Sequence, residues 1–338
     1  MQITKINSFL KSESFENRTF YLGIFLLLST PAIASLLLIF SVLINQYKIK
    51  DSYFKDYWNI PFFFASIFML FSCIVNTIKS NSSFSDIYDI NLTWIGLFNW
   101  IPYFFCFWLF KNFTSTSFQR KKILIYLLLG SLPLFITGYL QYFFKINGPF
   151  TFLFGLLKWY SRPIENYDGL SGLFNNANYA GTWLNIILPV SITFALEKKR
   201  NLIYKYFSIS IFLSVVICTL LTYSRNSWFG FLIGLILVTG LNTLRWLLPL
   251  LISISIPVFG SIGIFPYQSI IDFCRKIVPP LIWDYKLISI GFDTFSQYGR
   301  FEIWIAAYKF ILERPIWGWG AASFPVLFEI KTDLWKGH

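Results

Sequence analysis

Isolated basic side chains in a mostly apolar sequence are the residues best able to do chemistry. Arg225 lies between two apolar runs, and the others are Lys158, Arg162, Arg300, Arg314 and His338. Arginine presents a rigid, permanently charged fork of donors that can grip two phosphate oxygens at once. Histidine has an unperturbed pKa near neutrality, so His338 can take a proton from an attacking hydroxyl. The set suits transfer from a diphosphate-linked lipid carrier to a hydroxyl group.

Other kinds of catalytic site have no signature in this sequence. It lacks the phosphate-binding pattern G-x-x-x-x-G-K-[ST], the pattern G-x-S-x-G, and any cluster of histidines and carboxylates at metal-ligand spacing. The four cysteines form no C-x-x-C pair, so neither a zinc site nor a disulfide framework is predicted. We therefore expect no metal and no cofactor.

The composition is that of a membrane protein. Of 338 residues, 56% are hydrophobic and only 13% are charged, whereas soluble domains carry about 25% charged residues. The net charge of +12 comes mostly from short basic segments beside apolar runs. Such segments set membrane topology and contact anionic lipids, so we expect no nucleic-acid partner. The predicted fold class is all-α, a polytopic transmembrane helix bundle with a large extracytoplasmic loop.

The apolar runs predict the spans and their direction. Basic residues favour the cytoplasmic side, which places residues 119–122 and 197–200 in the cytoplasm and 144–178 outside. The helix that follows 197–200 then ends outside, so Arg225 is extracytoplasmic, where the positive-inside rule does not explain it. The runs cover residues 20–45, 58–78, 92–110, 123–143, 179–196, 203–223, 226–244 and 246–264.

The first run contains a predicted helix break. Thr30-Pro31 lies near the middle of residues 20–45, and proline removes a backbone donor and restrains the residue before it. Two short helices would return the basic N-terminus to the cytoplasm, while one continuous span would not. Both readings stay open, and we favour the hairpin. The first run carries no cleavage signal, so we expect it to stay in the membrane.

The predicted organisation has three parts. Residues 1–19 form a cytoplasmic N-terminus, residues 20–264 a transmembrane bundle of about eight or nine helices, and residues 265–338 an extracytoplasmic loop. Within the loop, residues 301–312 have the apolar spacing of an amphipathic helix. Glu313-Arg314-Pro315 should end it, with Arg314 as a solvated turn residue. The following Trp317 and Trp319 suit anchoring at the membrane interface.

Three segments resemble the O-antigen ligase and O-antigen polymerase superfamily, which includes a cyanobacterial branch once named as a bicarbonate transporter. Residues 172–180, GLFNNANYA, resemble the family's G-x-F-x-N-P-N-x-x-A, with Ala177 in place of proline. Residues 224–230, SRNSWFG, are similar to S-R-[GA]-x-[WL]-x-G. Residues 300–304 and 315–320 resemble R-x-x-[IL]-W and P-[IL]-x-G-x-G. The resemblance covers about residues 120–338.

The resemblance implies a metal-independent glycosyltransferase of the bacterial inner (plasma) membrane, acting in lipopolysaccharide biosynthesis at the cell envelope. Its donor would be an undecaprenyl-diphosphate-linked glycan and its acceptor a hydroxyl of a glycolipid or glycan. By carry-over, Arg225 and Arg300 would bind the diphosphate and His338 would be the catalytic base. Asn176 and Asn178 belong to the first motif and would bind substrate.

Several alternatives to this interpretation stay open. Asn176 and Asn178 precede an apolar run and are equally suited to capping that helix. Arg225 has a second interpretation as an interfacial anchor. At the level of function, the alternatives are an O-antigen polymerase, a small-anion transporter of the bicarbonate type, or an inactive truncated remnant ending at His338. The apolar runs carry essentially no ionisable group at mid-membrane, which weighs against transport.

Overall fold

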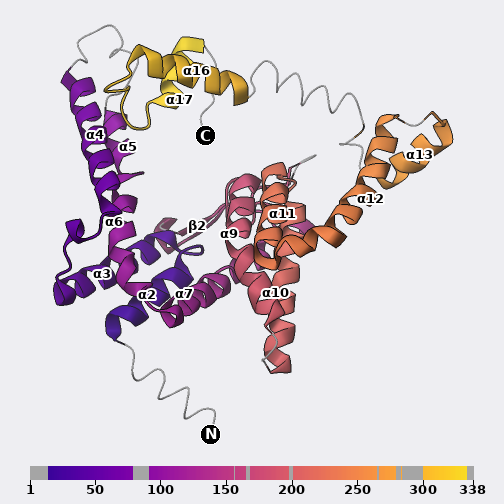
Figure 1. Ribbon diagram of the computed structural model, residues 1–338, viewed down its shortest axis with the longest axis horizontal. Coiled ribbons are helices and arrows are strands. Elements are labelled where there is room, and N and C mark those ends of the chain that lie inside the picture. Colours follow the sequence, from indigo (N-terminus) through magenta and orange to yellow (C-terminus); the bar gives the residue numbers. More distant parts are fainter. Residues whose placement is uncertain are drawn as a thin grey trace. The chain divides into compact units, whose positions relative to one another are not determined.

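A computed structural model of the 338-residue chain describes residues 14–78, 91–155, 157–164, 168–197, 201–264, 266–278, 283 and 300–332. The chain divides into two compact units. Unit 1 comprises residues 1–49 and 113–256, and unit 2 comprises residues 50–112 and 257–338. Helices dominate both units, which confirms the all-α class (Figure 1).

Unit 1 begins with two helices that pack against each other. Helix α2 covers Phe15–Leu26 and α3 covers Pro31–Ile49. The helix break expected at Thr30-Pro31 therefore lies between them, and Pro31 occupies the first position of α3, where its missing N–H costs nothing. At the open end of the pair, Lys48 Nζ lies 2.9 Å from Glu16 Oε2.

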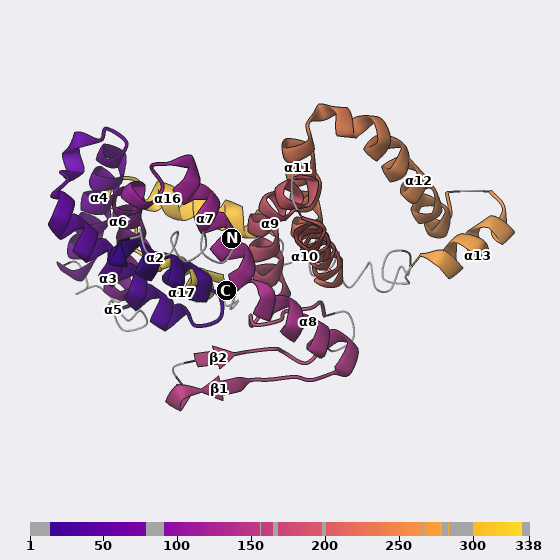
Figure 2. The ribbon, with the colours of Figure 1, turned by 90° about the horizontal axis from the view of Figure 1, so that it is seen from below.

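The next apolar run is also divided. Helix α7 covers Ser117–Gly130, and α8 covers Leu132–Phe144. Thr116 and Gln119 form a capping box that starts α7. The division falls at Ser131, two residues before Pro133, and Trp183 Nε1 donates to Ser131 Oγ at 2.8 Å. After α8 the chain forms a small antiparallel hairpin of β1 (Phe150–Phe152) and β2 (Leu157–Trp159), joined by the 3₁₀ turn η4 (Leu153–Gly155) (Figure 2).

Three consecutive helices form the centre of unit 1. Helix α9 covers Ala177–Leu196, α10 covers Leu202–Leu221 and α11 covers Arg225–Thr239, and both α10 and α11 pack against α9 (Figures 1 and 2). The buried core follows α9, with neighbours from α8, α10 and the loop before α9; it includes Leu134, Leu170, Leu184, Ile187, Leu188 and Val215.

Gly240 ends α11 earlier than the sequence predicted. The apolar run continues to residue 244, but Gly240 adopts φ 85°, and the 3₁₀ turn η5 (Leu241–Thr243) then leads into α12 (Leu244–Ile262). A positive φ costs glycine little. Helix α11 therefore has 15 residues, a length of about 22 Å.

Unit 1 has two chemically different ends, separated by the length of α9. At one end Lys121 Nζ lies 3.1 Å from Glu197 Oε1. At the other end lie the start of α9, the end of α10 and the start of α11. The placement of residues 119–122 and 197–200 on the cytoplasmic side stays a prediction.

Unit 2 contains helices from both halves of the chain. Its first part has the 3₁₀ turn η1 (Tyr53–Lys55), α4 (Asn59–Ile78), α5 (Asn91–Leu97), α6 (Ile101–Leu109) and the 3₁₀ turn η3 (Phe110–Phe113). Its second part has α13 (Gln268–Ile277), α16 (Arg300–Glu313) and α17 (Phe324–Thr332). Phe310, Leu327 and Phe328 form a small core between α16 and α17.

Helix α16 covers the segment in which the sequence predicted an amphipathic helix. It ends at Glu313, where the sequence predicted an end. Its predicted stripe is exposed at Trp304, Tyr308 and Ile311, while Phe310 faces the core. A row of exposed aromatic and aliphatic side chains suits a helix that lies against a membrane.

Seven helical segments of the described chain are long and apolar enough to cross a membrane. A spanning helix needs about 20 mostly apolar residues. The protein is thus a multi-pass membrane protein, and α11 is a shorter apolar helix beside these spans. The segments are Pro31–Ile49, Asn59–Ile78, Asn91–Phe113, Ser117–Phe144, Ala177–Leu196, Leu202–Leu221 and Leu241–Ile262.

Candidate functional site

The first predicted motif forms the start of α9. Asn176 is the N-cap residue, with extended backbone, and its Oδ1 accepts a hydrogen bond from the Asn178 backbone N–H at 2.7 Å. An N-cap of this kind satisfies a free amide of the first turn. The capping interpretation of Asn176 is therefore correct, and the amide nitrogen of its side chain is left for other contacts.

Asn178 connects the first motif to the second. Ser224 Oγ donates to Asn178 Oδ1 at 2.8 Å, across 46 residues of sequence. Ser224 is the N-cap residue of α11, but its side chain makes no capping hydrogen bond, and its hydroxyl donates to Asn178 instead. The structure thus brings together two motifs that the sequence could only place on the same side of the membrane.

Glycine allows α9 and α11 to approach closely beside this hydrogen bond. A Cβ at Gly181 would lie 1.7 Å from Ser227 Oγ, far inside van der Waals contact. Small residues at helix contacts are the usual means of close packing in membranes. Gly181 and Ser227 therefore fix the separation at which Asn178 reaches Ser224.

A strained turn leads into α11. Tyr223 has φ 50°, a left-handed conformation that is uncommon for a bulky residue. Its hydroxyl lies 2.9 Å from the hydroxyl of Tyr142 on α8, which holds the side chain in place. Strain of this kind gathers at ligand-binding positions and is held by the surrounding structure. We call residues 222–226 the serine-arginine turn.

Gln141 holds the loop before α9. The side chain is fully buried, its Nε2 donates to Arg162 O and Ser171 Oγ, and its Oε1 accepts from the backbone N–H groups of Ser171 and Gly172. The four distances lie between 2.6 and 3.1 Å. Both N–H donors and both lone pairs of the amide are used on this loop. Gln141 therefore sets the position of the loop.

The loop, the start of α9 and the serine-arginine turn enclose a cavity of about 270 Å³. Both α9 and α11 begin at this cavity, so two helix N-termini supply partial positive charge there. Its lining is largely polar, which suits an anionic or sugar ligand better than an apolar one. The lining residues are Arg162, Pro163, Asp168, Gly169, Ser171, Asn175, Asn176, Ala177, Asn178, Thr222, Tyr223 and Ser224.

Two arginines belong to this region in different ways. Arg162 lines the cavity, and one guanidinium nitrogen donates to Asn175 O at 3.2 Å. Arg225 is the first residue of α11, next to the lining residue Ser224, and its exposed side chain does not line the cavity itself. Within the described chain no hydrogen bond or ion pair engages the Arg225 guanidinium. Both arginines have donors available for an anion at this end of unit 1.

Of the other two predicted residues, one belongs to unit 2 and one lies outside the described part. Arg300 is the first residue of α16 in unit 2. His338 lies outside the described residues. The structure therefore joins Asn176, Asn178 and the serine-arginine turn into one site.

Arg314 corrects the sequence prediction. It is half-buried rather than solvated: a guanidinium nitrogen donates to Asn76 Oδ1 at 2.5 Å, and the guanidinium carbon lies 3.6 Å from the centre of the Trp319 ring. Burial lowers its pKa from the ordinary value, although an arginine stays charged at neutral pH. We call residues 314–322 the aromatic turn.

The aromatic turn is tied to α4 and α5 by several further contacts. Trp319 Nε1 donates to Phe310 O at 3.0 Å, and Ser72 Oγ donates to Trp317 O. A Cβ at Gly320 would lie 2.2 Å from Thr93 Cγ2, so only glycine fits there. Gly320 thus permits close contact between the aromatic turn and α5.

Gln141 and Arg162 are the members of the site that the sequence did not single out for a role. Arg162 is one of several isolated basic residues predicted on the outer side, and Gln141 lies within the apolar run at 123–143. An uncharged amide inside a membrane span is unusual enough to indicate a buried hydrogen-bond partner. That signal points to Gln141 but does not identify what it binds.

Comparison with known families supports the resemblance. Residues 209–337 match the family model described as O-antigen ligase, which supports the O-antigen ligase and polymerase superfamily. The matched segment begins in α10 and includes the serine-arginine turn, the aromatic turn and α16. Searches of characterised proteins and of solved structures gave no match.

Proposed function

We propose that this O-antigen ligase-like membrane protein is a glycosyltransferase that moves a glycan from an undecaprenyl-diphosphate carrier to an acceptor hydroxyl on the extracytoplasmic face. The family match supports a membrane enzyme of the O-antigen ligase or polymerase type. The observation that carries the finer proposal is the hydrogen bond between Asn178 and Ser224, because it assembles two motifs around one polar cavity beside Arg225.

The chemistry of the cavity fits a diphosphate. Two helix N-termini and the donors of Arg162 and Arg225 offer positive potential without a metal ion. A diphosphate is a good leaving group when its charge is neutralised, and fixed donors stabilise the charge that develops on it as the glycosidic bond breaks. The amide nitrogens of Asn176 and Asn178 add neutral donors for a sugar hydroxyl or a phosphate oxygen.

The remaining roles come from the resemblance. Arg300 would bind the diphosphate together with Arg225, and His338 would take the proton from the acceptor hydroxyl as the oxygen attacks the anomeric carbon. The lipid diphosphate leaves with the electrons of the broken bond. The polar cavity would hold the donor headgroup at the outer surface of a bacterial inner membrane.

The test uses the full chain in proteoliposomes with an undecaprenyl-diphosphate glycan and a glycolipid acceptor. Arg225→Ala should lower transfer and donor binding about 100-fold, since two charge-assisted hydrogen bonds at roughly 1.5 kcal/mol each are lost. Arg225→Lys should recover part of the loss. Arg245→Ala, at the start of α12 and beyond the far end of α11, is the matched control and should leave both unchanged.

Donor binding is measured separately from transfer because binding does not require the proposed catalytic base, His338. Equal binding and transfer by Arg225→Ala and the wild type would remove Arg225 from the site. Saturable uptake of bicarbonate by the same proteoliposomes, with no donor binding, would favour an anion transporter instead. Elongation of the donor glycan, without transfer to a glycolipid, would identify a polymerase.

A further inference from the structure

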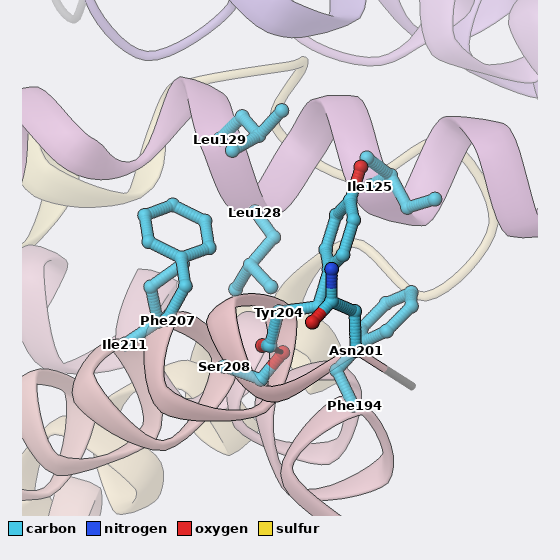
Figure 3. Close-up of a pocket in the computed structure, with 9 residues that line it drawn as sticks. All are labelled: Ile125, Leu128, Leu129, Phe194, Asn201, Tyr204, Phe207, Ser208 and Ile211. Atoms are coloured by element: carbon cyan, nitrogen blue, oxygen red, sulfur yellow. Dashed lines mark hydrogen bonds between the residues drawn. The ribbon is translucent and has the colours of Figure 1, made fainter. Parts of the chain in front are cut away.

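A second cavity, of about 570 Å³, lies in unit 1 between α7, the end of α9 and α10. Figure 3 shows side chains of α7 and α10 facing each other across it, with Phe194 at one side. The lining is apolar along most of its length, from Ile125, Leu128, Leu129, Phe194, Phe207 and Ile211. Asn201, Tyr204 and Ser208 complete it near the start of α10. We call it the inner groove.

The apolar surface of the inner groove lies on helices that span the membrane. An unfilled hollow of this size would lose the dispersion contacts of its lining atoms. Ligand pockets commonly have volumes of about 300–1,000 Å³, so the groove can hold a sizeable apolar chain. In a bilayer the surrounding molecules with such chains are lipids, which makes an acyl chain the natural occupant.

The mouth of the inner groove is basic. Lys121 lies one helical turn before Ile125 on the same face of α7, and its Nζ is 6.0 Å from the ring centre of Phe194. Lys205 shares a face of α10 with Asn201 and Ser208, four residues before it and three after. Both lysines are exposed.

The charge at this mouth stays positive after its one described carboxylate is counted. Glu197 pairs with Lys121 at 3.1 Å, which leaves the charge of Lys205 unbalanced. In the sequence, Lys198-Lys199-Arg200 follow Glu197 directly. Basic pockets between membrane helices on the cytoplasmic side bind anionic lipid headgroups. The mouth therefore selects an anionic over a zwitterionic headgroup.

We propose that the inner groove is a binding site for an anionic phospholipid, with one acyl chain between α7 and α10 and the phosphate near Lys121 and Lys205. The site is separate from the polar cavity, since the two lie at opposite ends of α9. The lipid joins α7 to α10 at a place where the protein's own side chains leave a gap. Its binding does not depend on the proposed transfer reaction.

The test is native mass spectrometry of the purified full chain with phosphatidylglycerol or phosphatidylcholine of identical acyl chains. The wild type should retain one phosphatidylglycerol at least tenfold more tightly than phosphatidylcholine, since each lysine near a headgroup is worth about fivefold. Ser208→Trp, which fills the groove, should lower retention of both lipids about tenfold. Ser210→Trp, on the exposed side of the same helix, is the control and should bind as the wild type does.

A variant without the two lysine charges separates the contribution of the lipid headgroup to binding from that of the acyl chain. Lys121→Gln with Lys205→Gln should abolish the preference for phosphatidylglycerol and leave phosphatidylcholine retention unchanged, while Lys145→Gln at the other end of unit 1 should have no effect. If Ser208→Trp does not fold, Ile211→Phe replaces it with a smaller addition. Equal lipid retention by the filled and control variants would overturn the proposal. So would a groove-filling variant that changed only the oligomeric mass, because the occupant would then be a second copy of the chain.

Discussion

The serine-arginine turn and the aromatic turn both place an arginine beside a helix end, but they use it in opposite ways. In the aromatic turn, Arg314 donates to Asn76 and stacks on Trp319, so its guanidinium is engaged by groups of the protein itself. At the serine-arginine turn, Arg225 is exposed and the neighbouring Arg162 donates one hydrogen bond, to Asn175. Arg225 and Arg162 have N–H donors available beside a polar cavity, which suits ligand binding. The guanidinium of Arg314 is covered by the Trp319 ring, which suits a role in stability.

The difference extends to the small residues around each turn. Gly181 lets α9 approach α11 at Ser227, and the result is a cavity. Gly320 lets the aromatic turn approach Thr93, and the result is a closed contact. In both places the absence of a Cβ allows two segments to approach closely. In unit 1 a polar cavity lies near the contact, and in unit 2 the contact itself is closed.

The largest expected effect is on the ligand side of this comparison. Arg162→Ala should weaken binding of the undecaprenyl-diphosphate donor by about 10- to 100-fold, because hydrogen bonds to a charged group are worth roughly 1.5–3 kcal/mol. Thermal stability should stay close to that of the wild type, since the exposed guanidinium makes one hydrogen bond within the described chain. Isothermal titration and a melting curve measure the two quantities. A large loss of stability with unchanged donor binding would contradict the assignment.

The second prediction concerns the stabilising arginine. Arg314→Ala should lower the free energy of unfolding by about 2 kcal/mol, because a half-buried hydrogen bond and a cation–π contact are removed together. Arg314→Lys should recover little, since an ammonium lacks the flat face that covers Trp319. Denaturant unfolding in detergent checks the value, and donor binding is the companion measurement. If binding fell while stability held, the two turns would not differ as described.

The smallest expected effect comes from a carboxylate. Asp168 is the acidic residue lining the polar cavity, and it would repel a diphosphate there. Asp168→Asn should therefore strengthen donor binding by about two- to fivefold, an increase that fades as salt is raised because exposed charges are screened. Titrations at low and high ionic strength test it. Weaker binding by Asp168→Asn would indicate that Asp168 accepts hydrogen bonds from the sugar instead.

The residues of the site differ in how far sequence could predict them. The Asn176 cap follows from an asparagine directly before an apolar run, a local rule. Contact between Asn178 and Ser224 joins positions 46 residues apart, and only their shared side of the membrane was predictable. Gln141 binds a loop 21 to 31 residues away, so its role depends on packing that no local pattern encodes.

The helices show the same division between local and distant causes. Hydropathy identified most of the apolar segments, and Pro31 placed the break between α2 and α3. Gly240 was overlooked because the run continues past it, although a glycine near the end of an apolar run is a common helix stop. Arg314 was misjudged because Glu-Arg-Pro is typical of an exposed turn, while its partner Asn76 lies 238 residues away.

The shortness of α11 gives the bilayer a part in the chemistry. A helix of 15 residues spans about 22 Å, against a hydrocarbon core of roughly 30 Å. A spanning helix this short is matched by thinning of the bilayer beside it, which would bring the headgroup layer toward the Arg225 end. A lipid-borne diphosphate would then meet the arginine at its own depth, without being pulled out of the membrane. Membrane thickness thereby becomes a physical variable that sets how often donor and protein meet.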